Sequence, residues 1–203
     1  MNTKFEEAYR AWDKAVECDL AGDHQTATKL FETAARSGFP PAHLELAIRA
    51  RTEGNQDEVR SNLRSIEQLA ETGDTLALFV AYMAYQNWLG EQDVNEQDRI
   101  ANDYLKRAAE LGEPEAQGTL AENYRAGLNG LCENLPLYEY WVQKAIDSGD
   151  QDSIYSFVEY LLDNKRPVPA ELRHKLAETA EHMNVAAKLL ARVAKTERRR
   201  KPA

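Results

Sequence analysis

The sequence predicts an all-α fold, a helical solenoid built from about five stacked helix pairs. This prediction rests on a sequence motif that occurs four times. In it, a helix-forming run with small residues ends at a glycine, and another small residue follows four positions later. The glycines are Gly38, Gly73, Gly112 and Gly149, which are 35, 39 and 37 residues apart. A period of this length is typical of stacked helix pairs and differs from the pattern of a single globular core.

Apolar residues recur at helical spacing within each segment of this pattern. In residues 4–21, Phe5, Trp12 and Val16 fall on one side of a helix that is expected to stop at Gly22. Glycine ends such helices because it adopts the left-handed backbone conformation at little cost. The same reasoning predicts further helices over residues 24–37, 42–52, 56–72, 75–89, 95–111, 114–126, 135–148 and 152–163.

The expected helices form one domain over residues 1–196. Residues 170–194 are expected to form a closing helical cap, because a terminal repeat must shield the last apolar face. Residues 197–203 form a basic tail, and we favour a solvated terminus over a nucleic-acid or membrane contact because the chain as a whole is acidic. The repeats are expected near residues 4–37, 41–72, 75–111, 114–148 and 151–196.

Two consecutive segments resemble the Sel-one-like repeat, a tetratricopeptide-like helical repeat. Residues 116–127 are similar to its first helix and read AQGTLAENYRAG. Residues 104–112 are similar to its second helix and read YLKRAAELG, with an aromatic residue, paired alanines and a terminal glycine. The chain departs from the family at residues 128–132, where LNGLC replaces the usual Gly-Val loop. The resemblance implies a right-handed α-solenoid of antiparallel helix pairs.

The composition limits the classes of function. The formal net charge is −9 and the isoelectric point is about 5.1, which argues against nucleic-acid binding because phosphate contacts need a basic face. Acids near the amino terminus replace the apolar run of a secretory signal, and no stretch is long enough to span a bilayer, so we expect a cytoplasmic protein with no membrane partner. Cys18 and Cys132 are expected to be free thiols.

No catalytic or metal-binding pattern emerges. The four histidines lie in different repeats, without the spacing of a metal motif, and neither cysteine has an adjacent base to activate it. We therefore expect no catalytic residue, no metal, no cofactor and no enzymatic activity. The histidines, interpreted as surface or structural residues, are His24, His43, His174 and His182.

The resemblance also implies where a partner would bind. In tetratricopeptide-like solenoids the first helix of each pair lines the concave groove. The predicted partner-binding residues are Leu44, Ile48, Arg51, Leu76, Phe79, Met83, Gln86, Glu122, Arg125, Tyr155 and Glu159. The alternative is that these side chains are core, because the helix over residues 75–89 is apolar nearly all round and its residues from Tyr82 to Trp88 are expected to be buried.

Three classes of function remain open. The leading hypothesis is an adaptor that captures a helix or an extended peptide of a partner protein in the groove. A narrower version is a cognate inhibitor, such as an immunity protein that neutralises a basic toxin or enzyme, because an acidic protein can mask a basic cleft. A self-associating scaffold, in which the groove closes a homodimer, is the second class. A hydrolase is the third, and no constellation of residues supports it.

Overall fold

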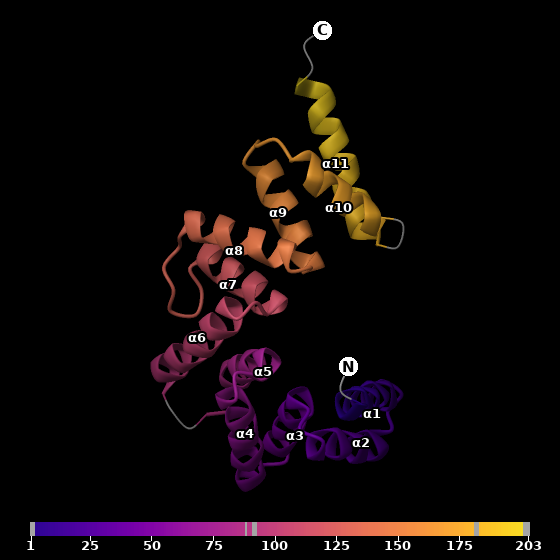
Figure 1. Cartoon of the computed structure of the whole chain (residues 1–203), viewed down its shortest axis with the longest axis vertical. Coiled ribbons are helices and arrows are strands. Elements are labelled where there is room, and N and C mark those ends of the chain that lie inside the picture. The colour runs from indigo at the N-terminus through magenta and orange to yellow at the C-terminus, as the bar shows by residue number, and fades with distance from the viewer. Residues whose placement is uncertain (1–2, 88, 91–92, 181–182, 201–203) are drawn as a thin grey trace. The chain divides into compact units, whose positions relative to one another are not determined.

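The computed structural model of the chain describes residues 3–87, 89–90, 93–180 and 183–200, and these residues form eleven helices and no strand (Figure 1). The all-α prediction is confirmed. The helices are α1 (Thr3–Leu20), α2 (His24–Arg36), α3 (Pro40–Thr52), α4 (Gln56–Glu71), α5 (Thr75–Gln86), α6 (Val94–Glu110), α7 (Pro114–Ala126), α8 (Leu135–Asp147), α9 (Gln151–Asp163), α10 (Ala170–Ala180) and α11 (Asn184–Arg200).

Four of the turns between described helices combine a glycine with a capping residue, namely those at residues 22–23, 54–55, 73–74 and 149–150. Gly73 has a φ of 82° and follows α4, and the next residue, Asp74, accepts a hydrogen bond from the backbone N–H of Ala77 at 2.8 Å. Gly149 has a φ of 99°, and Asp150 caps α9 in the same way. The repeated glycine therefore ends one helix, and the residue after it starts the next.

Two boundaries differ from the sequence-based prediction by three residues or more. Helix α5 ends at Gln86, because the Asn87 side chain bonds back to the carbonyl oxygen of Met83 at 2.8 Å and closes the helix three residues early. Trp88, which was expected in the core, lies outside the described residues. The closing cap consists of two helices, and the second continues to Arg200, so part of the basic tail is helical.

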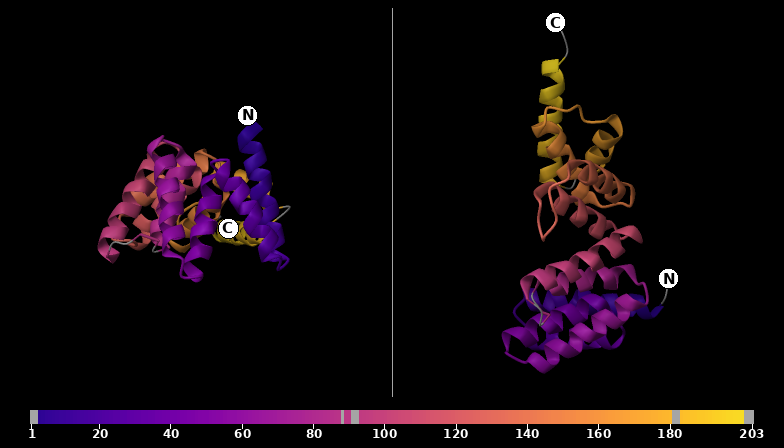
Figure 2. Two further views of the ribbon diagram at one scale, coloured as in Figure 1. Left: turned by 90° about the horizontal axis from the view of Figure 1, so that it is seen from below. Right: turned by 90° about the vertical axis from the view of Figure 1, so that its left-hand side faces the viewer.

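The chain divides into two compact units. The first contains residues 1–116 and 129–131. In it, consecutive helices from α1 through α6 pack against one another, and α3 also contacts α5, the next helix but one (Figure 2). Phe31, Ile66 and Leu78 are among its fully buried side chains. Contact between alternate helices is the packing that a solenoid of helix pairs requires, because each repeat buries its apolar face on its neighbour. A single domain over residues 1–196 stays a prediction.

The second unit contains residues 117–128 and 132–203. Its core includes the fully buried Tyr138 and Val158. Helix α11 packs against both α9 and α10, so α9 and α11 repeat the alternate-helix contact of the first unit (Figure 1). The apolar side of α11 that enters this core consists of Ala186, Leu189 and Val193.

Gly118 sets how closely α7 approaches α9 in the second unit. A Cβ atom at this position would lie 2.6 Å from Asp150 Oδ2 and 2.8 Å from Ser153 Oγ. Both distances are shorter than van der Waals contact, and Asp150 is the residue that caps α9. The absence of a side chain at residue 118 therefore lets the capped end of α9 pack on α7.

We expect Gly118→Ala to lower the free energy of unfolding by about 1–2 kcal/mol. The clash and the displaced cap together cost more than the roughly 1 kcal/mol that alanine gains in a helix. Urea unfolding followed by circular dichroism measures this. In an Asp150→Ala, Ser153→Ala background the space is free, so the same substitution should be neutral or stabilising; an equal loss in both backgrounds would contradict the packing argument.

Candidate functional site

Seven of the predicted partner-binding residues lie in the first unit and form what we call the α3–α5 face. Its members are Leu44, Ile48 and Arg51 on α3, and Leu76, Phe79, Met83 and Gln86 on α5. Helices α3 and α5 are in contact, so the structure brings these seven residues onto neighbouring helices.

The members of the α3–α5 face differ in burial. Leu44 is 8% exposed and Phe79 is 6% exposed, and the Phe79 ring stacks on Tyr82 with the ring centroids 5.8 Å apart. These two side chains hold the helices together and present little surface to a partner. Ile48 and Met83 are half-buried, as are Leu76 and Gln86. The accessible part of the face is therefore narrower than the full set of seven residues.

Arg51 closes one end of the α3–α5 face. It is exposed, and its guanidinium group donates a hydrogen bond to the backbone carbonyl of Asn87, just after α5 ends. Gln86 directly precedes Asn87. Its side-chain amide nitrogen is buried and has no hydrogen-bond partner among the residues that the structure describes. A cation and an amide donor therefore lie at the carboxyl ends of the two helices, where the backbone carbonyls also favour positive charge.

The other four predicted residues lie in the second unit, on α7 and α9. On α7, Arg125 Nε donates to Glu122 Oε2 at 2.6 Å, and this hydrogen bond raises the pKa of Arg125 above its usual value. The carboxylate of Glu159 on α9 lies close enough to add to this effect. Tyr155 is 9% exposed, and its hydroxyl donates to the sulfur of Met183 at 3.2 Å, so its ring is part of the core.

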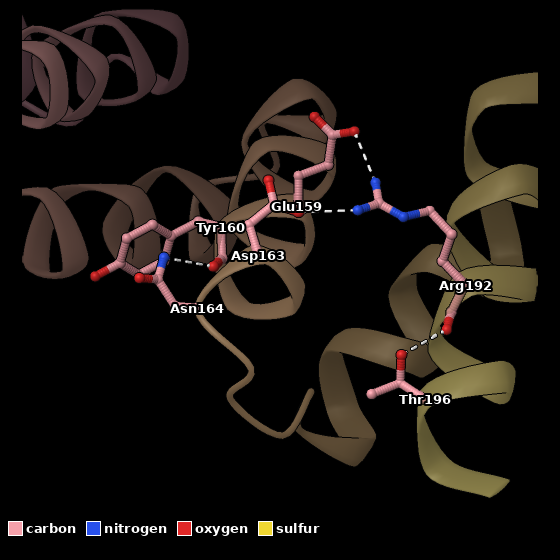
Figure 3. Close-up of polar contacts among 6 residues, drawn as sticks. All are labelled: Glu159, Tyr160, Asp163, Asn164, Arg192 and Thr196. Atoms are coloured by element: carbon pink, nitrogen blue, oxygen red, sulfur yellow. Dashed lines mark hydrogen bonds and ion pairs between the residues drawn. The ribbon is translucent and has the colours of Figure 1, made fainter. Parts of the chain in front are cut away.

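Glu159 already has a partner within the chain. Arg192 on α11 places Nη1 3.3 Å from Glu159 Oε1 and Nη2 2.9 Å from Asp163 Oδ1, as Figure 3 shows. The sequence analysis missed Arg192 because it lies in the closing cap. The available signal was the pair Glu159 and Asp163, which are four residues apart and so lie on one side of α9, ready for a basic residue on a neighbouring helix.

A polar cleft of about 380 Å³ runs along α6 in the first unit, and the sequence analysis did not predict it. One side is α6 from Asn95 to Lys106, and the other is the loop 129–131, part of the segment 128–132 that stands in place of the usual Gly-Val loop. The buried Asn102 side chain donates to the backbone carbonyl of Asn129, a residue with a φ of 53°. This hydrogen bond holds the loop against α6.

The histidines and cysteines are dispersed. The described part of the chain contains no group of three or more His, Cys, Asp or Glu residues that could hold a metal ion. His24 bonds to Asp19 at 2.6 Å and His43 to Asn62 at 2.9 Å, and both contacts are structural. His182 lies outside the described residues. None of the described helices is long and apolar enough to cross a membrane.

Comparison with known proteins gives the fold. No protein-family model matches the chain, and neither does any curated protein. A Sel1 repeat protein from Oxalobacter formigenes matches 82% of the chain at 22% identity with a TM-score of 0.60. A protective antigen of uropathogenic Escherichia coli with an SLR fold matches 84% at 19% identity with a TM-score of 0.52. The chain has the Sel1-like repeat fold. It spans 49% and 41% of the length of these two structures.

The Sel1-like fold of this chain includes a charged junction between α1, α2 and α3. Arg49 Nη2 lies 2.8 Å from Asp19 Oδ2, and the Arg49 guanidinium stacks over the Phe31 ring at 5.0 Å. The hydrogen bonds from Arg49 and His24 hold the pKa of Asp19 below its usual value. Glu45, one turn before Arg49, has no such bond, and burial raises its pKa.

We expect Glu45→Gln to stabilise the protein at neutral pH by up to about 0.5 kcal/mol, a small value because Glu45 is only half-buried. A raised pKa in the folded state means that the folded protein binds the proton more tightly, so ionisation of Glu45 lowers stability as the pH rises. The difference between variant and wild type should disappear below about pH 4, where the carboxyl is protonated in both states. Urea unfolding at both pH values measures it; a difference that persists in acid would contradict this explanation.

Proposed function

We propose that the protein is a non-catalytic interaction module that binds a helix or an extended peptide of a partner protein on the α3–α5 face. The observation that carries this proposal is that Ile48, Leu76 and Met83 are half-buried, on adjacent helices, beside the exposed Arg51. Apolar side chains that are rigidly placed but incompletely covered are suited to anchor a partner.

The apolar side chains of the α3–α5 face can contribute a modest binding free energy. A fully buried aliphatic side chain contributes about 1.5–3 kcal/mol, and these three are already partly covered, so each has roughly half of that left to gain from a partner. Arg51 and Gln86 supply donors at one end of the face, which would fix the direction of a bound segment. Leu44 and Phe79 contribute by holding α3 and α5 at the required separation.

The second unit has charged residues of its own that would contribute to the binding of a partner. Glu122 and Arg125 form one pair on α7, and Glu159 is bridged to α11 by Arg192. A partner that engages Glu159 must compete with Arg192, so Glu159 is more selective than an unpaired carboxylate would be. Tyr155 lies in the core of the second unit and holds α9 in place.

The test compares two double variants in affinity capture from the native lysate. Ile48→Asn, Met83→Gln removes apolar contacts from the α3–α5 face with little change in side-chain size. Arg64→Gln, Gln68→Ala changes two exposed residues of α4 and serves as the control. We expect a partner that the wild type and the control retain and that binds the face variant about tenfold more weakly, a change of about 1.4 kcal/mol.

Circular dichroism must show the same helicity for all three proteins, so that lost binding is not lost folding. A partner that binds the face variant as tightly as the wild type would exclude the α3–α5 face. A substitution of Phe79 is unsuitable for this test, because that ring is 6% exposed and its loss would damage the core.

The net charge of −9 favours a narrower form of this function, in which the partner is a basic protein and the module inhibits it by covering a basic cleft. Association should then slow by about tenfold or more between low salt and about 0.5 M salt, because screening removes electrostatic steering. Stopped-flow mixing with the captured partner measures the rate. An association rate that does not depend on salt would leave a general adaptor and exclude the electrostatic inhibitor.

A further inference from the structure

Helix α1 carries an apolar stripe that is largely exposed to solvent. Phe5 is 47% exposed, Tyr9 is 49% exposed and Leu20 is 85% exposed. Their spacings of 4 and 11 residues place them on one side of an α-helix, and we call these three residues the α1 stripe. Exposed apolar groups that line up in this way mark an interaction surface more often than isolated ones do.

The aromatic part of the α1 stripe is held rigidly from below. Phe39 is 3% exposed, and its ring lies edge-on to Phe5 at 5.6 Å and to Tyr9 at 6.2 Å. Trp12 packs against the same Phe39 ring at 5.8 Å. Because these contacts fix the rings before any partner arrives, docking on them would cost little side-chain entropy.

Acidic residues border one edge of the α1 stripe. Glu6, Asp13 and Glu17 lie at helical positions adjacent to it. Asp13 and Glu17 are exposed, whereas Glu6 is half-buried and its carboxylate lies 3.8 Å from Arg10. The surface therefore combines aromatic faces with carboxylates, which suits lysine or arginine side chains, because a cation can lie over the ring while its charge meets the acid.

Helix α11 has the complementary chemistry. Its 17 residues include six Lys and Arg and one Glu, a net charge of +5 in a chain whose total is −9, so the rest of the chain carries −14. The apolar side of α11 packs in the second unit. Lys188, Ala191 and Lys195 lie together on its outer side and are exposed. The small Ala191 between the two lysines leaves room for an aromatic ring to approach the helix closely.

We propose that α11 of one copy of the chain docks on the α1 stripe of a second copy, in a head-to-tail contact. The stems of Lys188 and Lys195 would cover Phe5 and Tyr9, with their ammonium groups near the acidic border. This contact joins two different surfaces, so it is heterologous, and each copy keeps one free α1 stripe and one free α11 unless the assembly closes into a ring.

Charge favours a second copy over other occupants. An anionic membrane or a nucleic acid could pair with α11 alone, whereas a second copy offers α11 a surface that is both acidic and apolar. Neither would use the α1 stripe, whose acidic border repels anions. The second copy is the occupant that uses both surfaces at once.

The test is sedimentation velocity of the full chain over a range of micromolar concentrations, at low and high salt. The wild type should show an average mass that rises with concentration and falls with salt. Two charge-reversal variants, Asp13→Lys, Glu17→Lys on α1 and Lys188→Glu, Lys195→Glu on α11, should each weaken self-association about tenfold or more. The attractions then become repulsions.

The variant with all four reversals should recover self-association, because the two surfaces are complementary again. This recovery separates the proposed contact from misfolding, since a damaged protein would not be rescued by further substitutions. As the control for the α1 variant, Glu71→Lys, Glu110→Lys raises the net charge by the same amount at exposed positions of α4 and α6 and should associate as the wild type does apart from the general effect of charge.

Several results would overturn the proposal. One is a wild type that is monomeric at every concentration. A second is a four-fold variant that associates no better than the two charge-reversal variants do. A third is self-association that the α1 reversals leave unchanged. A fourth is binding to anionic phosphatidylserine vesicles that needs Lys188 and Lys195 but not Asp13 and Glu17. None of these substitutions touches the α3–α5 face, so failure here leaves the proposed interaction function standing.

Discussion

The turn between successive helices is the constraint on which this structure depends. At four of these turns a glycine with positive φ ends one helix and the side chain of the next residue caps the following helix, so the chain reverses direction within three residues. Turns this short leave no freedom to choose distant neighbours. Each helix must bury its apolar side on the helices next to it in sequence, and the result is an array in place of a central core. Gly118 shows how tightly the array is packed, because even a methyl group there would meet the cap of α9.

In this packing, each helix has residues that contact neighbouring helices and residues that remain accessible to a partner. The small residues of each repeat, such as the fully buried Ala77 and Ala108, let helices approach closely and are buried between them. The larger side chains next to them are only partly covered, and their exposure depends on the neighbouring helix. Ile48 and Met83 remain accessible, whereas Leu44 and Phe79 do not. The interaction surface therefore consists of the side chains that the neighbouring helices leave uncovered.

The charges of the chain are also distributed unevenly. Acidic residues predominate over most of the helices, and basic residues are concentrated in α11, whose Arg192 bridges two acids of α9. This ion pair anchors a basic helix to an acidic one inside the second unit. The same complementarity is available to the outer side of α11, so one principle explains both the internal contact and the proposed contact between copies. Apolar exposure on α1 adds the driving force that surface charges alone do not provide.

The sequence by itself determined the helices and their period, because helix spacing, glycine stops and capping residues act over a few neighbouring positions. The resemblance of residues 104–127 to a Sel-one-like repeat also foretold the fold. The sequence could not determine which side chains of α3 and α5 stay accessible, why α5 ends at Asn87, or that Arg192 reaches Glu159 from 33 residues away. Only the tertiary structure decided these points, because burial and ion pairing depend on which helix lies opposite, and neighbours of that kind leave no periodic signal in the chain.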